Sequence, residues 1–236
     1  MRGVLKSLGR DPRHGPLPLL LVLLTVVTGL VDVVSYLGFG HVFVANMTGN
    51  VVFLGFAVVD AEDFSIAASL TAIAAFLLGA LAGGRLGSRH GAHRGRLCAA
   101  TLLIETLLVA LALAWVLAAA VSTPVGRYLV IAALSLAMGV QNATARRLAV
   151  PDLTTTVLTL TLTGFAADSS LAGGGNPRPG RRVIATTAMF VGAAVGALLL
   201  LRVSAGAVLS LVLVLLVVAL AAAASHWRST EIWTQP

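Results

Sequence analysis

Six long apolar segments constrain this chain more than any other feature of its sequence. A transmembrane helix needs about 20 mainly apolar residues. Only 11% of the residues are charged and 58% are hydrophobic, which is too little charge to cover a water-facing surface. The unbroken runs also exclude a β-barrel, whose strands alternate apolar and polar residues. The sequence therefore predicts an all-α polytopic membrane protein. The six expected spans are residues 17–38, 64–86, 97–121, 127–147, 183–201 and 203–225.

Two further apolar segments, residues 42–60 and 153–168, differ from these six. Both are short, and both are polar near their N-terminal ends: the first contains Asn46-Met47-Thr48-Gly49-Asn50 and the second is rich in threonine. Such segments either cross the membrane or enter and leave it on the same side. If all eight segments cross, Lys and Arg divide almost evenly between the two sides. If both short segments are re-entrant, 14 of the 16 Lys and Arg residues lie on one side.

The positive-inside rule decides between these topologies, because cytoplasmic loops carry the excess of Lys and Arg. It favours six transmembrane helices plus two re-entrant half-helices, with both termini cytoplasmic. Residues 1–16 then form a basic cytoplasmic N-terminus ahead of a retained first helix. Residues 226–236 form a cytoplasmic tail.

The chain also contains an internal repeat, of residues 17–121 and 127–225. Thr25, Gly29 and Asp32 match Ser135, Gly139 and Asn142 at an offset of about 110 residues, and Asp60 matches Asp168. Because each half has three crossings, the second half is inverted, which gives the 3+3 inverted repeat common in transporters. Two further pairs, Gly79/Gly83 and Gly192/Gly196, are interpreted as packing faces, where small residues let helix backbones approach closely.

The re-entrant geometry predicts a polar site near the bilayer centre. Asn and Thr satisfy free N–H groups at helix starts, and two half-helix N-termini meeting at this depth would favour negative or carbonyl oxygens. Irregular backbone there requires a cavity or surrounding protein. The competing interpretation is that these side chains are only caps and interhelical hydrogen bonds. The candidate ligands are Asn46, Thr48, Asn50, Thr154, Thr155 and Thr156.

Ionisable and amide side chains inside the spans extend this candidate site. Asp32 shares one helix face with Thr25, Thr28 and Ser35, and Glu105 falls near the membrane midplane. A carboxylate at that depth costs about 2.5–3.5 kcal/mol on insertion scales, so it is a functional candidate by default. A protonated side chain bonded to a neighbouring helix is the alternative. The amides Gln141 and Asn142 occupy the matching place in the second half.

Two motifs in this chain are long enough to compare with known families. The first comprises Thr28-Gly29-Leu30-Val31-Asp32 and the stretch GHVFVANMTGN at residues 40–50. The second comprises Met138-Gly139-Val140-Gln141-Asn142 and TTTVLT at residues 154–159. Both resemble the YoaK family of bacterial inner-membrane proteins, and the resemblance covers essentially the whole chain beyond residue 15. It implies a bacterial inner-membrane protein, and it supplies neither a reaction nor established site residues.

These observations favour a secondary transporter that moves a small solute or ion through a central cavity. A passive aquaporin-like channel and a non-transporting structural or assembly protein are the alternatives. An enzyme is not expected, because no nucleophile and base accompany each other, and no cofactor or metal site is expected. The partners are the lipid bilayer and the unidentified solute or ion. A homo-oligomer is left open as a possibility. The basic residues flank the apolar segments, so they indicate the orientation of the chain in the membrane rather than binding to nucleic acid.

Overall fold

The computed structural model describes residues 13–151, 153, 158–175 and 179–235, and this part of the chain is helical with no strand. Six of its helices, each of 21 to 25 residues, are long and apolar enough to cross a membrane. They are α2 (Leu17–Gly38), α4 (Ile66–His90), α5 (Arg94–Leu117), α6 (Pro124–Leu148), α8 (Pro179–Arg202) and α9 (Ala205–Ser225). The predicted all-α polytopic fold is confirmed.

Short helices complete the described part of the chain. Two of them are apolar: α3 (Met47–Val58) and α7 (Leu158–Ala167), with 12 and 10 residues. At 1.5 Å per residue neither is long enough to cross a hydrocarbon core of about 30 Å. Three 3₁₀ turns, η1 (Ala120–Ser122), η2 (Ser170–Ala172) and η3 (Ile232–Thr234), lie between or after the long helices.

Polar caps set where several spans begin. Ser65, Thr123 and Ser204 each accept a hydrogen bond from the backbone N–H three residues later, at the starts of α4, α6 and α9. The ring of His93 does the same for α5 through Arg96 N. These side chains satisfy N–H groups that lack intrahelical partners, so the helices begin at the end of the bundle rather than inside it.

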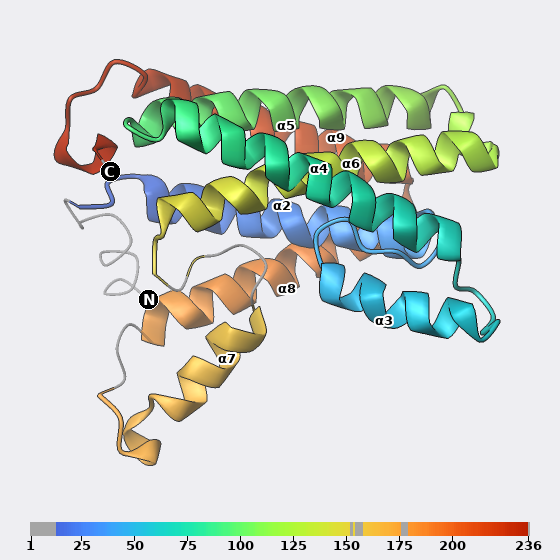
Figure 1. Cartoon of the computed structure of the whole chain (residues 1–236), viewed down its shortest axis with the longest axis horizontal. Helices are drawn as coiled ribbons and strands as arrows, with labels where there is room; N and C mark the ends of the chain where they lie inside the picture. Colours follow the sequence, from blue (N-terminus) through green and yellow to red (C-terminus); the bar gives the residue numbers. More distant parts are fainter. Residues whose placement is uncertain (1–12, 152, 154–157, 176–178, 236) are drawn as a thin grey trace.

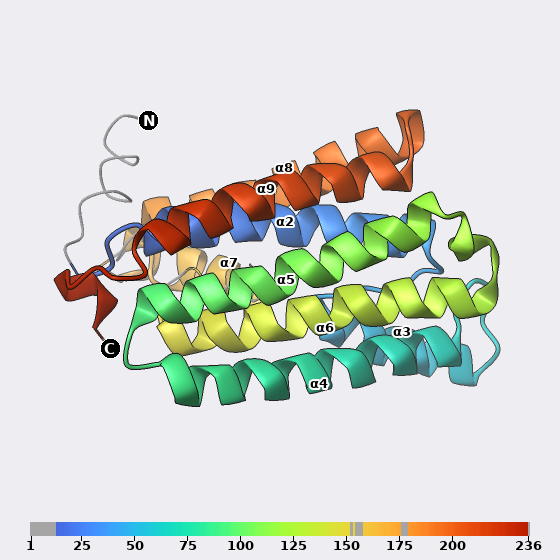
Figure 2. The same ribbon diagram turned by 90° about the horizontal axis from the view of Figure 1, so that it is seen from above.

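The long helices form one elongated bundle (Figures 1 and 2). The N-terminal end of α2 and the C-terminal end of α9 lie at the same end of it, on the left in Figure 1. α2 and α6 are the most enclosed helices. The bundle interior holds buried polar side chains such as Thr28 and Gln141, whereas large apolar side chains such as Leu77 and Phe190 are exposed. The exposed apolar side chains suit a surface that faces lipid, and the core they surround is also mainly apolar.

Glycines bring the two halves of the chain into close contact. A Cβ atom added at Gly79 of α4 would lie 2.1 Å from Leu136 O of α6, and one at Gly192 of α8 would lie 2.2 Å from Val26 O of α2. Gly83 also faces α6, and Gly196 faces α2. Helix backbones approach this closely only where side chains are absent. The interpretation of both glycine pairs as packing faces is therefore confirmed, and each face joins one half to the other.

The two short apolar helices occupy opposite ends of the bundle. After α2 the chain turns back along the bundle, so that α3 begins near the middle of its length and runs out to the end where α2 finished (Figures 1 and 2). α7 lies at the other end, beside α8, and splays away from the bundle axis (Figure 1). Its last turn is tied to α8, because Arg182 donates hydrogen bonds to Asp168 and to Gly164 O. Each short helix thus lies in one half of the bundle's length.

Candidate functional site

A cavity of about 690 Å³ opens where α3 begins. Its volume lies within the range of about 300–1,000 Å³ that is common for small-molecule sites. Side chains from α2, the loop before α3, α3, α4, α7 and α8 meet around it, so both halves of the chain contribute. The lining residues are Asp32, Ala45, Asn46, Met47, Thr48, Gly49, Val52, Phe53, Phe76, Leu158, Thr159 and Met189.

Asp32 borders this cavity and also fixes its wall. The carboxylate lies on α2 and is only 4% exposed. Its Oδ1 atom accepts hydrogen bonds from Val44 N at 3.0 Å and Ala45 N at 2.8 Å. These two hydrogen bonds hold the loop that turns the chain back toward the middle of the bundle. Asp32 therefore places the N-terminus of α3 beside the cavity.

The rest of the polar stripe on α2 bonds to backbone of its own helix, and Thr28 also accepts a hydrogen bond from Gln141 of α6. Thr25 and Thr28 donate to the carbonyls of Leu21 and Leu24 in the preceding turn, and Ser35 donates to Asp32 O. These hydroxyls satisfy backbone of their own helix, as Ser and Thr commonly do inside helices. The spacing of these residues placed them with Asp32 on one helix face. Of the four side chains on that face, Asp32 alone borders the cavity.

Two of the predicted ligands at the start of α3, Asn46 and Thr48, line the cavity with exposed side chains. Asn46 occupies the N-cap position, yet its side chain makes no capping hydrogen bond. Thr48 lies one residue inside the helix. The prediction that one of these side chains caps α3 is therefore wrong for Asn46. Its amide faces the cavity, because the loop is held by Asp32 instead.

Asn50 has a different role from the predicted one. Its side chain is fully buried; Oδ1 accepts from Phe43 N at 2.8 Å, and Nδ2 donates to Phe43 O at 2.6 Å. The amide thus pairs with both backbone groups of Phe43, as a neighbouring strand would. The Phe43 ring stacks on Tyr36, with centroids 5.0 Å apart, and lies 5.5 Å from Phe53. Asn50 clamps the loop against α3, and it is not among the cavity-lining residues.

This clamp makes a stability prediction that separates Asn50 from Asn46. Asn50→Ala leaves Phe43 N and Phe43 O without their partner in a partly buried setting, and a buried group left unpaired costs about 1–3 kcal/mol. We expect a clearly lower melting temperature for Asn50→Ala in detergent. Asn46→Ala is the matched control, since that amide makes no capping bond, and it should melt like the wild type. Equal melting temperatures for all three proteins would contradict the clamp.

The other predicted site residues lie away from the cavity or outside the described residues. Glu105 is fully buried in α5, and within the described part of the chain neither carboxylate oxygen has a hydrogen-bond partner. Gln141 donates to Thr28 Oγ1 at 3.0 Å, which ties α6 to α2. Asn142 donates to Met138 O in its own helix. None of these three lines the cavity. The predicted residues Thr154, Thr155 and Thr156 lie outside the described residues.

The sequence reasoning missed several cavity residues from distant elements. Thr159 and Leu158 begin α7, Met189 comes from α8 and Phe76 from α4. Thr159 belongs to the threonine run that indicated the second half-helix, so the sequence did contain a signal for this residue. Nothing in the local sequence distinguishes Met189 or Phe76 from other apolar helix residues. Their place follows from the glycine contacts, since Gly29 faces Met189 O and Gly139 faces Phe76 O.

The lining offers one carboxylate, an amide and two hydroxyls next to thioethers and aromatic rings. Such a site can bind a small solute or ion with a few polar groups. No group of three or more His, Cys, Asp or Glu side chains suited to a metal ion occurs among the residues that the structure describes. The carboxylate of Asp32, the first turn of α3 and the first described residues of α7 face one space.

Comparison with known proteins places the chain in a family. A family model described as "Protein of unknown function (DUF1275)" matches residues 20–221. The chain belongs to the DUF1275 family. It is 36% identical over 154 residues to the UPF0700 transmembrane protein YoaK of Bacillus subtilis (strain 168), a match that covers 64% of this chain and 66% of that protein. The chain therefore spans just under two thirds of that relative's length. No solved structure matches this DUF1275 protein.

These matches confirm the resemblance to the YoaK family inferred from the two motifs. They agree with the six apolar helices in describing a multi-pass membrane protein. Asp32, Asn46 and Thr48 all fall within residues 20–221, the part of the chain that the family model matches.

Proposed function

We propose that this DUF1275 protein is a secondary transporter of a small solute or ion. The observation that carries the proposal is the cavity of about 690 Å³ that Asp32 borders between helices of both halves. An ionisable residue within a membrane span that borders a cavity is a functional-site candidate by default. The protein would lie in the inner membrane, and no enzymatic chemistry is proposed.

The helix pairing supports an inverted-repeat architecture for this transporter. α4 of the first half packs on α6 of the second, and α8 of the second half packs on α2 of the first, each through a glycine face. The two contacts are equivalents of each other under the repeat offset found in the sequence. Transporters with inverted repeats bind substrate at the repeat interface and move one part against the other around that site. The cavity lies beside both glycine contacts, because Phe76 and Met189 line it.

Glu105 supports coupling to an ion gradient. Its buried carboxyl group has no hydrogen-bond partner among the described side chains and backbone groups, and burying a bare carboxylate is costly. Proton uptake removes that cost, so Glu105 is suited to bind a proton in one state of the cycle and release it in another. Asp32 would contact the solute or ion directly, whereas Glu105 would act from the bundle interior.

Flux measurements test the proposal. The purified chain is reconstituted in vesicles of phosphatidylethanolamine and phosphatidylglycerol, and amino acids, sugars, alkali-metal ions and inorganic anions are offered one class at a time. Uptake that stops when the proton or sodium gradient is dissipated supports a secondary transporter. Uptake that follows only the solute's own gradient supports the channel. Absence of flux for every class supports a structural or assembly role.

A passive channel is the second candidate, favoured by one observation. α3 begins near the middle of the bundle's length and α7 lies in the opposite half, which resembles the paired half-helices of aquaporin-type pores (Figures 1 and 2). Against it, α7 splays away from the bundle axis, whereas a pore would need both half-helices at one axis. The transporter is therefore the proposed function.

The proposed orientation makes a labelling prediction. With both termini cytoplasmic, the end of α4 near Ser88 faces the cytoplasm and the loop at Glu62 faces outside; both side chains are exposed. In a Cys98→Ala background, Glu62→Cys should react with a membrane-impermeant maleimide added to intact cells. Ser88→Cys should react only after the membrane is opened. The reverse pattern would overturn the orientation. Labelling of both positions from outside would contradict a topology in which they lie on opposite sides of the membrane.

A further inference from the structure

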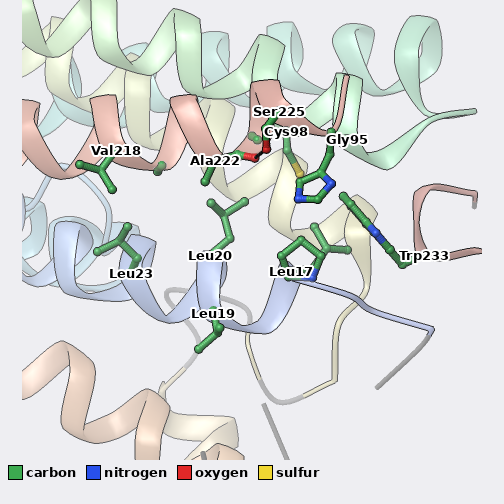
Figure 3. A pocket seen from close by; sticks show the side chains of 14 residues that line it. Leu17, Leu19, Leu20, Leu23, Gly95, Cys98, Val218, Ala222, Ser225 and Trp233 are labelled. Carbon is green, nitrogen blue, oxygen red and sulfur yellow. Dashed lines mark hydrogen bonds between the residues drawn. The ribbon is translucent and has the colours of Figure 1, made fainter. Parts of the chain in front are cut away.

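A second cavity lies at the end of the bundle where both described chain ends are found, and it shares no lining residue with the first. It has a volume of about 280 Å³ and lies between α2, the start of α5 and the end of α9. Figure 3 shows Leu20 and Leu23 on α2 facing Val218 and Ala222 on α9, with Trp233 at one end. Nothing in the proposed transport cycle uses this cavity.

The C-terminal tail closes one end of this cavity. The Trp233 indole lies over Gly15, where an added Cβ would come within 2.5 Å of the ring, and edge-on to His226, with centroids 5.1 Å apart. Two long-range hydrogen bonds fold the tail over α5: His93 Nε2 to Ser229 O at 2.9 Å, and Arg96 Nε to Trp227 O at 3.2 Å. The tail thus makes a wall for the cavity instead of extending away from the bundle.

The lining selects an apolar occupant. Leucine, valine, alanine and a buried cysteine make most of it, and the Ser225 hydroxyl is satisfied by Ala222 O at 2.8 Å. Native interiors hold few voids larger than a water molecule, and an apolar space of this size gives water few hydrogen-bond partners. Hydrocarbon fills such a space far better than water does.

The mouth of the cavity points to the source of that hydrocarbon. Leu19 on α2 and Val218 on α9 line the cavity and are also 49% and 56% exposed, on the outer surface of helices apolar enough to span a membrane. The opening therefore faces lipid. At the Trp233 end of the cavity Arg94 donates to Arg13 O and Arg96 to Trp227 O, so two guanidinium groups lie at this end of the bundle.

From this geometry we propose that the cavity between α2, α5 and α9 holds one acyl chain of an anionic phospholipid, with Arg94 and Arg96 beside its headgroup. The headgroup lies at the Trp233 end, and the hydrocarbon chain runs from there between α2 and α9 toward Leu23 and Val218. This site is independent of the transport cavity, and it stands whether or not the protein transports a solute.

Lipid retention tests the proposal with a matched pair of variants. Ala222→Phe puts a ring into the cavity, whereas Ala221→Phe adds the same ring at a neighbouring exposed position of α9 that does not line it. The full chain is reconstituted in vesicles of equal phosphatidylglycerol and phosphatidylethanolamine, extracted in mild detergent and weighed by native mass spectrometry. We expect one retained phosphatidylglycerol on the wild type and on Ala221→Phe. The lipid-bound fraction of Ala222→Phe should be at least about fivefold lower.

A second measurement needs no substitution. Cys98 is the single cysteine of the chain, is buried and lines the cavity, so a bound acyl chain would cover its thiol. Its alkylation by a lipid-soluble maleimide is followed at alkaline pH, which favours the reactive thiolate. Adding phosphatidylglycerol to delipidated protein in detergent should slow that alkylation several-fold. Equal lipid retention by Ala222→Phe and wild type, or an alkylation rate indifferent to added lipid, would overturn the proposal. Equal retention of both phospholipids would overturn the anionic headgroup assignment.

Discussion

Gly79→Ala should cost this protein most of its folded yield, although it adds only one methyl group. The new Cβ would lie 2.1 Å from Leu136 O and within 3.0 Å of two further backbone atoms of α6. Backbone atoms cannot rotate away as a flexible side chain can, so α4 and α6 must separate. Overpacking a core typically costs about 1–3 kcal/mol, and we expect this contact to reach or exceed the upper end of that range. Gly192→Ala should behave alike, with its Cβ 2.2 Å from Val26 O.

Matched glycines in the same helices make this experiment specific. Gly84, five residues along α4, has nothing within 4 Å of an added Cβ, and Ala is the better helix former by about 1 kcal/mol. Gly84→Ala should therefore leave the melting temperature unchanged or raised. Gly196→Ala should cost less stability than Gly192→Ala, because its nearest neighbour would lie 3.3 Å away rather than 2.2 Å. Melting temperature and monodisperse yield in detergent measure all four; Gly79→Ala melting like Gly84→Ala would show that the α4–α6 contact is looser than described.

Much of the fold follows from the sequence, because lipid imposes simple rules on a chain. The expected span at residues 17–38 coincides with α2, and the two segments judged too short and polar are the short helices α3 and α7. Length and hydropathy decide these features residue by residue. Helix caps shifted other boundaries by a few residues: α4 begins after Ser65, and α5 begins at Arg94, after the cap His93.

The candidate site was harder to predict, since depth in the membrane does not say which way a side chain points. Glu105 was placed near the midplane from its distance to Arg96, and it is buried, but it faces the bundle interior away from the cavity. Asn50 belongs to the same polar motif as Asn46 and Thr48, and only the folded loop shows that its amide is engaged by Phe43. Met189 reaches the cavity through helix packing, which no local pattern encodes.

Asp32 allows its charge to be separated from its structural role. One oxygen, Oδ1, accepts both loop hydrogen bonds, and an asparagine at this position keeps an equivalent acceptor. Asp32→Asn should therefore hold the loop from Val44 to Ala45 and preserve the melting temperature to within a few degrees. Asp32→Leu removes the acceptor, leaves two buried N–H groups unpaired, and should destabilise the protein as strongly as Asn50→Ala does.

Transport activity, unlike stability, should depend on the negative charge of Asp32 and not only on its hydrogen-bond acceptor. If the carboxylate binds a cationic group or ion in the cavity, Asp32→Asn should lower ion-coupled flux by about 10- to 100-fold, as coupling energies of about 1–3 kcal/mol imply. Asp63→Asn is the matched control: it makes the same chemical change at an exposed position with φ of 70°, a conformation that asparagine also tolerates. That variant should transport like the wild type. Undiminished flux in a well-folded Asp32→Asn protein would remove the carboxylate from the transport site. Asp32 would then act as the anchor of the loop, and the cavity would bind its solute through Asn46, Thr48 and Thr159 alone.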